Sequence, residues 1–545
     1  MTKSEKYRSW PARLAYLMIM LAFSACSDYL ELTPTNRVTD NIVWNSTSNA
    51  DKFLNNIYAG LPREYNNADP VDNFSDDAFA GPPNQYSRTT FALANYTSND
   101  APNYWSSSYS NIRKCNLFID NMKESKLSTD WKTLRTAEVR FLRAYYYHIL
   151  WMNYGGVPII TDVLNQSEQG DAIYRARNTH AETFNFIIEE LESIVQDLPL
   201  KSEAGRATRG AALTLKGWCE LFEASALNNP GNDQSKWKSA AETNKQVIES
   251  GVYSLFPNFQ SMFYEENNNN VEEIFSRQYL GGTALGGSRE GLTGPFNVGG
   301  ESKSFGGVRP THNIVQEFFM ANGLPITDPA SGYDPNAPYL NREKRFYYTV
   351  SFDGAEWLGT KMVYRVGSGS LIEFNRGSPT GYDLVKGMNP KYAVHNDQKL
   401  NSASQKYFRY AEVLLNFAEA QNEVSGPIAS VYDALNQIRK RVDLPPLKAG
   451  LSQDAMRKAI HQERRVELAF EQKRYLDLLR WKTAEVVLNQ NLLGMKIENG
   501  GKGTIATVVP VAGGQRLFYP EKNYLLPIPQ SSIDKNSQLK QNPNY

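Results

Sequence analysis

The 545-residue chain has few of the side chains on which metal and redox chemistry depend, with 3 cysteines and 5 histidines. Neither HExxH nor CxxC occurs, and no cysteine follows His461-Gln462-Glu463, as a zinc deaminase site would require. The sequence also lacks a phosphate-binding GxxxxGK, a dinucleotide-binding GxGxxG and a GxSxG nucleophile motif. It therefore predicts no resident metal, no cofactor and no catalytic centre of these classes.

The chain has no surplus of either charge, because 58 lysines and arginines balance 58 aspartates and glutamates. A dedicated nucleic-acid-binding protein needs a basic surplus to neutralise phosphates, so we expect no nucleic-acid partner. Aromatic residues are by contrast plentiful, at 12% of the chain. Together with 41% hydrophobic residues, this is the composition of a folded globular protein.

Long hydrophobic runs are missing as well. The run over residues 14–23 has about half of the ~20 residues that a membrane-spanning helix needs. Basic side chains precede this run and Ser24-Ala25-Cys26 follows it, which is the pattern of a secretory signal. The letters LAFSAC resemble a bacterial lipobox, so we predict a lipoprotein signal peptide over residues 1–25 and lipidation of Cys26. The alternative is an ordinary secretory signal with an incidental cysteine.

Cleavage before Cys26 would remove four basic side chains and one acidic side chain, which leaves a mildly acidic mature chain. Stable anchoring takes more than one acyl chain, and a multiply acylated cysteine supplies them. Residues 26–50 are polar and irregular, so we expect a lipidated N-terminus and tether. Export would permit a disulfide between Cys115 and Cys219, but we favour two buried free thiols.

Helical periodicity dominates two wide parts of the chain. Apolar side chains recur at steps of three and four over residues 184–198, and Thr179 and Glu182 offer a capping box before them. A helix from Trp237 would end at a left-handed cap on Gly251. Further helices are predicted over residues 139–152, 211–222, 413–424 and 431–442, and from about 452 to 488. Neighbouring helices joined by short turns favour helix pairs stacked on one another.

The predicted helix over residues 452–488 carries a high density of charge. Its residues Glu471, Arg474, Asp477 and Arg480 alternate in sign at steps of three, which predicts an ion-pair ladder. The like charges of Glu463, Glu467 and Glu471 would be offset by Arg464, Arg465 and Arg474. Because large apolar side chains are interleaved, we interpret these charges as a partly buried packing network and not as catalytic groups.

Two tracts lack periodicity, about residues 62–104 and about residues 256–400. The second is rich in glycine and asparagine and contains several Gly-Gly pairs. Loops of this length are usually functional or disordered, and the interleaved aromatic residues argue against disorder. We therefore expect ordered loops with short strands over a helical scaffold, the setting in which binding residues usually lie.

Seven distinctive stretches follow one another along the whole mature chain. They are 143–158 (RAYYYHILWMNYGGVP), 205–218 (GRATRGAALTLKGW), 310–319 (PTHNIVQEFF), 407–423 (YFRYAEVLLNFAEAQNE), 434–447 (ALNQIRKRVDLPPL), 463–481 (ERRVELAFEQKRYLDLLRW) and 524–545 (YLLPIPQSSIDKNSQLKQNPNY). Together they resemble the SusD/RagB family of outer-membrane nutrient-binding lipoproteins. Gln472 departs from the family pattern, which often has glycine there, and Ser537 stands where proline is frequent.

The resemblance implies an all-α fold, a tetratricopeptide-like helical-pair scaffold with long irregular loop insertions and short strands. The chain would comprise an N-terminal helical region, 51–255, and a C-terminal region, 256–545, whose loop-rich part over about 256–400 binds the ligand. The resemblance also implies a lipid-anchored protein exposed on the outer membrane, in a complex with a SusC-like TonB-dependent transporter. Such a protein captures oligosaccharides or polysaccharides and has no catalytic activity.

Sugars present C–H faces on which aromatic rings stack, and hydroxyls that amides, carboxylates and guanidinium groups bond. For Trp105, one of the candidate ligand-binding residues, the alternative role is that of a core anchor beside Tyr109 and Ile112. For the candidates in the loop-rich tract, the alternative role is packing within the loops. Two other functions stay open. One is peptide binding by a protein that covers the transporter as a lid in the same way, and the other is a surface glycosidase built on Asp76-Asp77. The candidate ligand-binding residues are Asp77, Asn103, Tyr104, Trp105, Tyr279, Phe296, Arg309, Tyr333 and Trp357.

Overall fold

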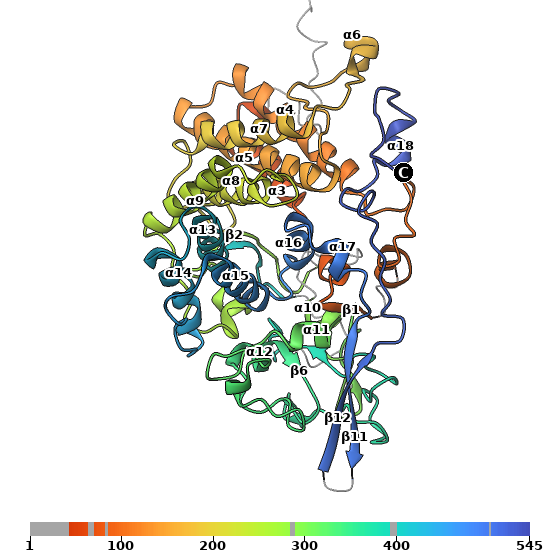
Figure 1. The fold of residues 1–545 in the computed structure, drawn as a ribbon. Helices are drawn as coiled ribbons and strands as arrows, with labels where there is room; N and C mark the ends of the chain where they lie inside the picture. Colours follow the sequence, from red (N-terminus) through yellow and green to blue (C-terminus); the bar gives the residue numbers. More distant parts are fainter. Residues whose placement is uncertain (1–42, 64–69, 82–85, 284–288, 393–400, 501–502) are drawn as a thin grey trace, which may run out of the picture.

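The computed structural model describes residues 43–63, 70–81, 86–283, 289–392, 401–500 and 503–545. The predicted signal peptide, 1–25, and Cys26 lie outside these residues. Helices dominate the described part and its strands are short, so the predicted helical scaffold with short strands is confirmed (Figure 1). Within these ranges, no helix has the length and apolar character needed to cross a membrane.

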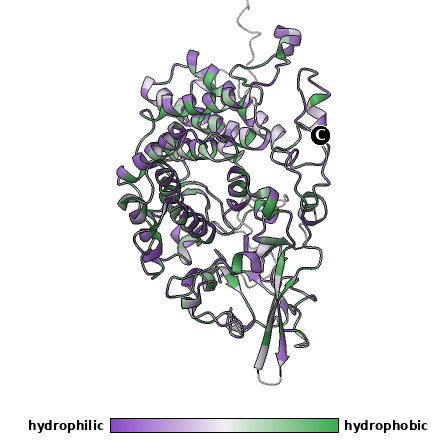
Figure 2. Ribbon diagram, in the orientation of Figure 1, coloured by the Kyte–Doolittle hydropathy of each residue, from purple (hydrophilic) through white to green (hydrophobic). Residues whose placement is uncertain are grey.

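The N-terminal half is a stack of helices in which each packs against the next. Hydrophilic and hydrophobic residues alternate along these helices, as expected of amphipathic elements (Figure 2). The predicted capping box of Thr179 and Glu182 begins α7, and Gly251 follows α9 with a φ of 64°. The stack comprises α4 (Trp105–Glu124), α5 (Thr129–Tyr154), α7 (His180–Ile194), α8 (Arg209–Ala224) and α9 (Gln234–Glu249).

The folded part begins earlier than residue 51. Helix α3 (Thr47–Ala59) packs on α4 and α5, and Ser46 caps its N-terminus. Trp44 is 8% exposed and lies edge-on to Phe53 and Phe118. The last residues of the predicted tether, 26–50, are therefore part of the fold, because Trp44 buries its ring in the main core.

The helical stack continues directly from α9 to α13 (Tyr410–Ser425), although 160 residues separate these helices in the sequence. Helices α14 (Ala429–Arg441) and α15 (Gln453–Glu467) then pack on α13. Strand β2 (Glu273–Arg277) pairs antiparallel with β10 (Gln405–Arg409), which leads straight into α13. The residues between α9 and α13 therefore form an insertion, and the β2–β10 pair closes its neck.

A second hydrophobic core is formed mostly by residues of the insertion, such as Phe318, Phe346 and Tyr382. Residues of other segments, such as Phe470 and Ile497, complete it. The expectation of ordered loops with short strands is therefore confirmed for the described residues of the insertion. Its elements are η4 (Ser261–Phe263), η5 (Glu265–Asn267), α10 (Arg289–Thr293), β3 (Asn297–Val298), β4 (Glu301–Ser302), β5 (Val308–Pro310), α11 (His312–Val315), η6 (Pro329–Ser331), α12 (Lys344–Thr349), β6 (Val350–Ser351), β7 (Glu356–Trp357), β8 (Thr360–Lys361) and β9 (Asp383–Leu384).

The first irregular tract contains η1 (Val71–Phe74), β1 (Ala78–Ala80) and η2 (Ser87–Phe91). Strand β1 pairs antiparallel with β5 of the insertion, so the two tracts without periodicity meet in space.

The prediction of a single helix over residues 452–488 is wrong, because the chain forms three helices there: α15, α16 (Arg474–Arg480) and α17 (Ala484–Val487). Phe470, Gln472 and Lys482 have positive φ values of 58°, 62° and 57°, and left-handed backbone ends a helix. Glycine adopts this conformation freely, which explains why glycine suits position 472. The predicted ion-pair ladder is broken too, and of its steps only Asp477–Arg480 forms, at 2.8 Å.

The C-terminal residues form a hairpin and then return along the N-terminal half. Strands β11 (Leu493–Gly500) and β12 (Gly503–Pro510) project from the loop-rich end, a feature that the periodicity analysis did not predict (Figure 1). The Arg516 guanidinium then donates hydrogen bonds to three carbonyls of residues 73–78, at 3.0–3.1 Å. The short helix α18 (Gln530–Ile533) follows.

Candidate functional site

A cavity of about 180 Å³ lies where the helical stack, the first irregular tract and the C-terminal segment meet. Helices α5, α8 and α16 supply one side, and strand β10 with the turn after α15 supplies another. Tyr104, directly before α4, and the segment Asn523–Leu526 complete the lining. Concave sites with a largely apolar lining and a few convergent polar groups are where small molecules usually bind. We name this site the central cavity.

Aromatic rings make up much of the central cavity. Tyr145 and Tyr407 lie with their ring centroids 5.5 Å apart, and Phe74 stacks on Phe91 at 3.8 Å. Tyr104 and Tyr524 are only half-buried, whereas the other rings are largely withdrawn from solvent. The aromatic residues of the lining are Phe74, Phe91, Tyr104, Tyr145, Trp218, Phe263, Tyr407, Phe408, Tyr475 and Tyr524.

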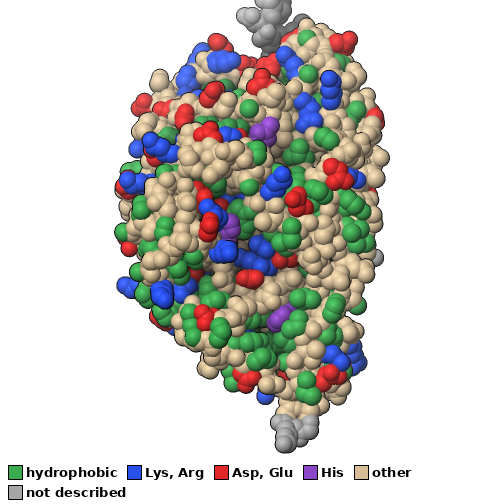
Figure 3. All heavy atoms as spheres, in the orientation of Figure 1, with side chains coloured by type: hydrophobic (Ala, Val, Ile, Leu, Met, Phe, Trp, Pro, Cys, Tyr) green, Lys and Arg blue, Asp and Glu red, His purple; other side chains and the backbone are tan. Residues whose placement is uncertain are grey.

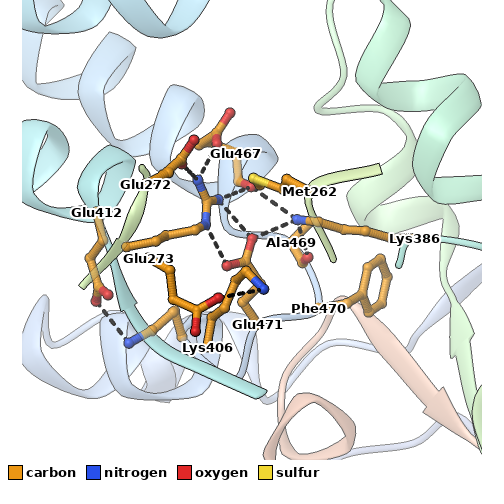
Figure 4. Close-up of polar contacts among 12 residues, drawn as sticks. Met262, Glu272, Glu273, Lys386, Lys406, Glu412, Glu467, Ala469, Phe470 and Glu471 are labelled. Atoms are coloured by element: carbon orange, nitrogen blue, oxygen red, sulfur yellow. Dashed lines mark hydrogen bonds and ion pairs between the residues drawn. The ribbon is translucent and has the colours of Figure 1, made fainter. Parts of the chain in front are cut away.

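One polar part of the lining, here called the polar wall, is the turn Glu471-Gln472-Lys473 between α15 and α16. Lys473 Nζ lies 2.9 Å from a carboxylate oxygen of Glu412 and donates a hydrogen bond to the carbonyl of Tyr407 at 3.0 Å. Glu471 accepts hydrogen bonds from Arg409 and from Lys386, and Figure 4 shows the contact with Lys386. The charges at the wall are therefore held in pairs.

The titratable groups of the lining have shifted pKa values with clear causes. Burial lowers the pKa of His148 to about 3, so its ring is uncharged at neutral pH. Burial raises the pKa of Tyr104 to about 12. For Glu471, burial acts to raise the pKa, but Arg409 and Lys386 outweigh it and bring the value to about 2. At neutral pH the cavity therefore offers phenols, amides and a paired carboxylate.

Among the nine candidate ligand-binding residues, Tyr104 lines the central cavity directly. The Tyr279 hydroxyl donates a hydrogen bond at 2.9 Å to the side chain of Gln405, which also lines the cavity. Asn103 is exposed, and its side-chain oxygen accepts a hydrogen bond at 3.2 Å from the backbone N–H of Ser106 at the start of α4. These three residues lie at or near one site.

Trp105 and Asp77 occupy buried positions in the protein. Trp105 is 6% exposed, and its ring lies 5.0 Å from Tyr109 and 5.3 Å from Tyr154, as the core-anchor alternative describes. Asp77 is 2% exposed and lies 2.6 Å from Arg465, which also lies 2.7 Å from Asp76. Both side chains are thus already engaged in contacts with the rest of the fold.

Asp76 has a second partner, Arg474, at 2.9 Å. Burial acts to raise the pKa of Asp76, but Arg465 and Arg474 outweigh it and hold the pKa far below its usual range. Figure 3 shows a hollow with clustered acidic and basic side chains at the level of α15 and α16. The carboxylates of Asp76 and Asp77, on which the glycosidase alternative depends, are therefore already paired with arginines.

The remaining four candidates belong to the loop-rich insertion. Arg309 is 4% exposed and lies 3.4 Å from Asp383, and Trp357 is 9% exposed within the core of the insertion. Phe296 packs against the same core, and Tyr333 is half-buried with the guanidinium of Arg342 5.9 Å from its ring centre. The nine candidates therefore do not surround one cavity: three lie at or near the central cavity, two are buried elsewhere in the fold, and these four lie in the insertion.

The sequence analysis did not select the cavity residues of α5, α16 and β10 as candidates. Tyr145, Tyr407 and Tyr475 lie in stretches that also read as ordinary helix or strand core, so aromatic type alone could not distinguish them. Gln472, noted in the sequence analysis as a departure from a family pattern that often has glycine, was the one local signal for the turn that carries Glu471 and Lys473.

Comparison with known proteins agrees with this architecture. Residues 271–545 match the sequence model of the SusD family, and residues 28–216 match a model described as "Starch-binding associating with outer membrane". A SusD-like protein of Formosa agariphila is 24% identical over 556 residues, which cover 98% of this chain and 99% of the relative. A SusD-like protein of Bacteroides ovatus is 25% identical over 474 residues, covering 85% and 80%.

Solved structures share the fold over nearly the whole chain. A SusD-like protein from Bacteroides fragilis gives a TM-score of 0.79 at 27% identity, covering 93% of this chain and 99% of that one. A SusD-like carbohydrate-binding protein from the same species gives 0.77 at 28% identity, covering 91% and 100%. Surface glycan-binding protein A from Bacteroides uniformis gives 0.68 at 21% identity, covering 91% and 99%, a likeness of fold alone.

Proposed function

The chain belongs to the SusD family, and on this premise we propose that it is a surface-exposed lipoprotein that binds glycans. It captures oligosaccharides and delivers them to a SusC-like TonB-dependent transporter in the outer membrane. The observation that carries the binding part is the central cavity, where aromatic rings and hydrogen-bonding groups converge. The similar solved structure described as carbohydrate-binding supports the same class of ligand.

The chemistry of the cavity suits a sugar. The rings of Tyr104 and Tyr524, both half-buried at the lining, offer flat surfaces for the C–H face of a pyranose. Gln472, Asn153 and the paired charges of Glu471 and Lys473 offer donors and acceptors for hydroxyls. Because the charged side chains are already paired, an uncharged ligand would leave their ion pairs intact.

The membrane part of the proposal rests on the N-terminal sequence and on the second family model. The LAFSAC segment supports lipidation at Cys26, and that model is described as associating with the outer membrane. Under this proposal the lipid holds the protein at the cell surface, and the folded part covers a transporter barrel. An obligate complex of this kind should bury more than about 2,000 Å².

Isothermal titration of the purified protein against matched panels of oligosaccharides and peptides tests the binding class. We expect at least one oligosaccharide to bind and no peptide to bind. Binding of peptides alone would show that the ligand is a peptide and not a glycan. Hydrolysis of a bound glycan would show that the protein is an enzyme.

The partner is tested separately, by affinity purification of the tagged, full-length protein from detergent-solubilised outer membranes of the organism that produces it. We expect a TonB-dependent transporter to co-purify in roughly equal amounts. Recovery of the tagged protein without such a transporter would contradict the lid role and would leave the binding result unaffected.

A further inference from the structure

The turn that carries the polar wall of the central cavity has unusual backbone geometry. It connects α15 to α16, and it has left-handed φ values at Phe470 and Gln472, neither of which is glycine. Such conformations cost free energy and persist where surrounding contacts fix them. The backbone N–H of Glu471 bonds to the carbonyl of Leu468, and that of Gln472 bonds to the Asp72 carboxylate at 3.0 Å. Asp72 lies outside the turn, and further contacts from outside it come from Arg409, Arg289 and Lys386.

Most of the contacts that come from the loop-rich insertion are made by Lys386. Its ammonium group donates hydrogen bonds to the carbonyl of Glu467 at 3.0 Å, to the carbonyl of Ala469 at 2.8 Å and to the Glu471 carboxylate at 2.7 Å (Figure 4). A lysine ammonium has three donors, so all three are used on the end of α15 and on the turn after it. The side chain is 1% exposed. Its Nζ lies 5.0 Å and 5.4 Å from the ring centres of Phe259 and Phe263.

We propose that Lys386 is a positioning residue that holds the turn Leu468–Lys473 in shape, so that the loop-rich insertion sets the polar wall of the central cavity. Its ammonium caps carbonyls at the C-terminal end of α15, where a positive charge is favoured. Arg289 of the insertion donates to the next carbonyl, that of Phe470, at 3.3 Å. The effect on ligand affinity rests on the proposed function, whereas the effect on the turn does not.

Gly387 makes this arrangement possible. It has a φ of 70°, and a Cβ at this position would lie 2.9 Å from Arg289 and 3.2 Å from Phe263. A larger residue would therefore press on Arg289 and on Phe263, whose ring lies beside the Lys386 ammonium group.

The environment of Lys386 makes the restraint sensitive to pH. The charged groups around it are Glu467 and Glu471 at the end of α15, Arg409 and Lys406 on β10, Arg441 on α14, and Arg289 on α10. Burial lowers the pKa of Lys386 to about 8, although Glu471 attracts the proton. Above this pH the amine loses its charge and one of its three donors, so the turn should loosen.

Hydrogen exchange at the amides of Glu471 and Gln472 tests the restraint without any ligand. At pH 7 we expect Lys386→Met to reduce the protection of these amides at least tenfold, while Glu471 keeps its contacts with Arg409. Lys391→Met, at an exposed lysine of the same insertion, is the matched control and should leave protection unchanged. Equal protection in Lys386→Met and the wild type would overturn the proposal.

The wild-type protein supplies a second test that needs no variant. Protection of the same two amides, corrected for intrinsic exchange, should fall between pH 7 and pH 9. Constant protection across this range would also overturn the proposal, and this holds even if Lys386→Met does not fold.

Titration with an oligosaccharide that binds the wild type tests the consequence for the cavity. We expect about tenfold weaker binding by Lys386→Met at pH 7 and unchanged binding by Lys391→Met. Unchanged affinity in Lys386→Met, with faster exchange in the turn, would overturn the role in the cavity. If the wild type binds no glycan, the proposed function fails, and the exchange result still decides whether Lys386 holds the turn.

Discussion

The guanidinium of Arg409 and the carboxylate of Glu467 lie 2.6 Å apart, with each side chain at most 2% exposed. Arg409 ends β10, where the insertion returns to the helical stack, and Glu467 ends α15. Arg409 also contacts Glu272 at 2.7 Å and Glu471 at 2.6 Å. One buried cation therefore joins the neck of the insertion to the helix that precedes the cavity turn.

Replacing Arg409 by methionine should destabilise the protein strongly, because three buried carboxylates, those of Glu272, Glu467 and Glu471, each lose one of their cationic partners. We expect the free energy of unfolding to fall by about 3–5 kcal/mol, measured by urea denaturation. Arg457→Met is the matched control, since Arg457 pairs with Glu423 from a side chain that is 35% exposed. The control should lose less than about 1 kcal/mol. Equal losses in the two variants would contradict a special role for the buried network.

The contribution of Glu471 to stability should depend on pH. Its pKa is about 2 in the folded protein, against an ordinary value of 4.5. A lowered pKa means that the stabilisation is present above about pH 4.5 and is lost as the pH falls towards 2. The difference in unfolding free energy between the wild type and Glu471→Gln should therefore be largest near pH 6 and should shrink by pH 3. A difference that stays constant over this range would contradict the assigned ion pairs.

Cys115 and Cys219 are both buried and unpaired, as the sequence analysis favoured. Burial raises the pKa of both thiols, and the thiolate is the reactive form. A variant that starts after Cys26 should therefore react with a thiol reagent only after unfolding, and then with both cysteines. Rapid reaction of the native protein, or fewer than two thiols after unfolding without reductant, would show that this placement is wrong.

Cys26→Ala tests the anchor. If the signal is of the lipoprotein type, the variant should incorporate no radiolabelled palmitate and should leave the membrane fraction, while the wild type is labelled and sediments with membranes. Cys115→Ala is the control and should behave like the wild type. Palmitate labelling that persists in Cys26→Ala would indicate another acylation site, and a wild type without label would favour the ordinary secretory signal.

The helices could be predicted because their signals are local. The capping box of Thr179 and Glu182 and the left-handed Gly251 mark ends that the chain itself specifies. The break after α15 could not be predicted in this way, because Phe470 and Gln472 are ordinary residues whose left-handed backbone depends on cations far away in the sequence. Lys386 and Arg289 supply contacts that no periodicity reveals.

The candidate site was predicted only in part for a related reason. Tyr104 lines the cavity, but Trp105, its neighbour, turns into the core, since successive residues at the start of a helix point in different directions. Similarly, Asp76 and Asp77 form ion pairs with Arg465 and Arg474, which lie almost 400 residues later in the sequence. Which residues face a cavity depends on how distant segments pack.

The central claim, that a glycan binds in the central cavity, is tested most directly by titrating one bound oligosaccharide into the wild type, Tyr104→Ala and Tyr519→Ala. Tyr519 is a matched control, because it is 44% exposed and does not line the cavity. We expect Tyr104→Ala to bind at least tenfold more weakly and Tyr519→Ala to bind like the wild type. Wild-type affinity in a folded Tyr104→Ala variant would contradict the placement of the glycan in this cavity.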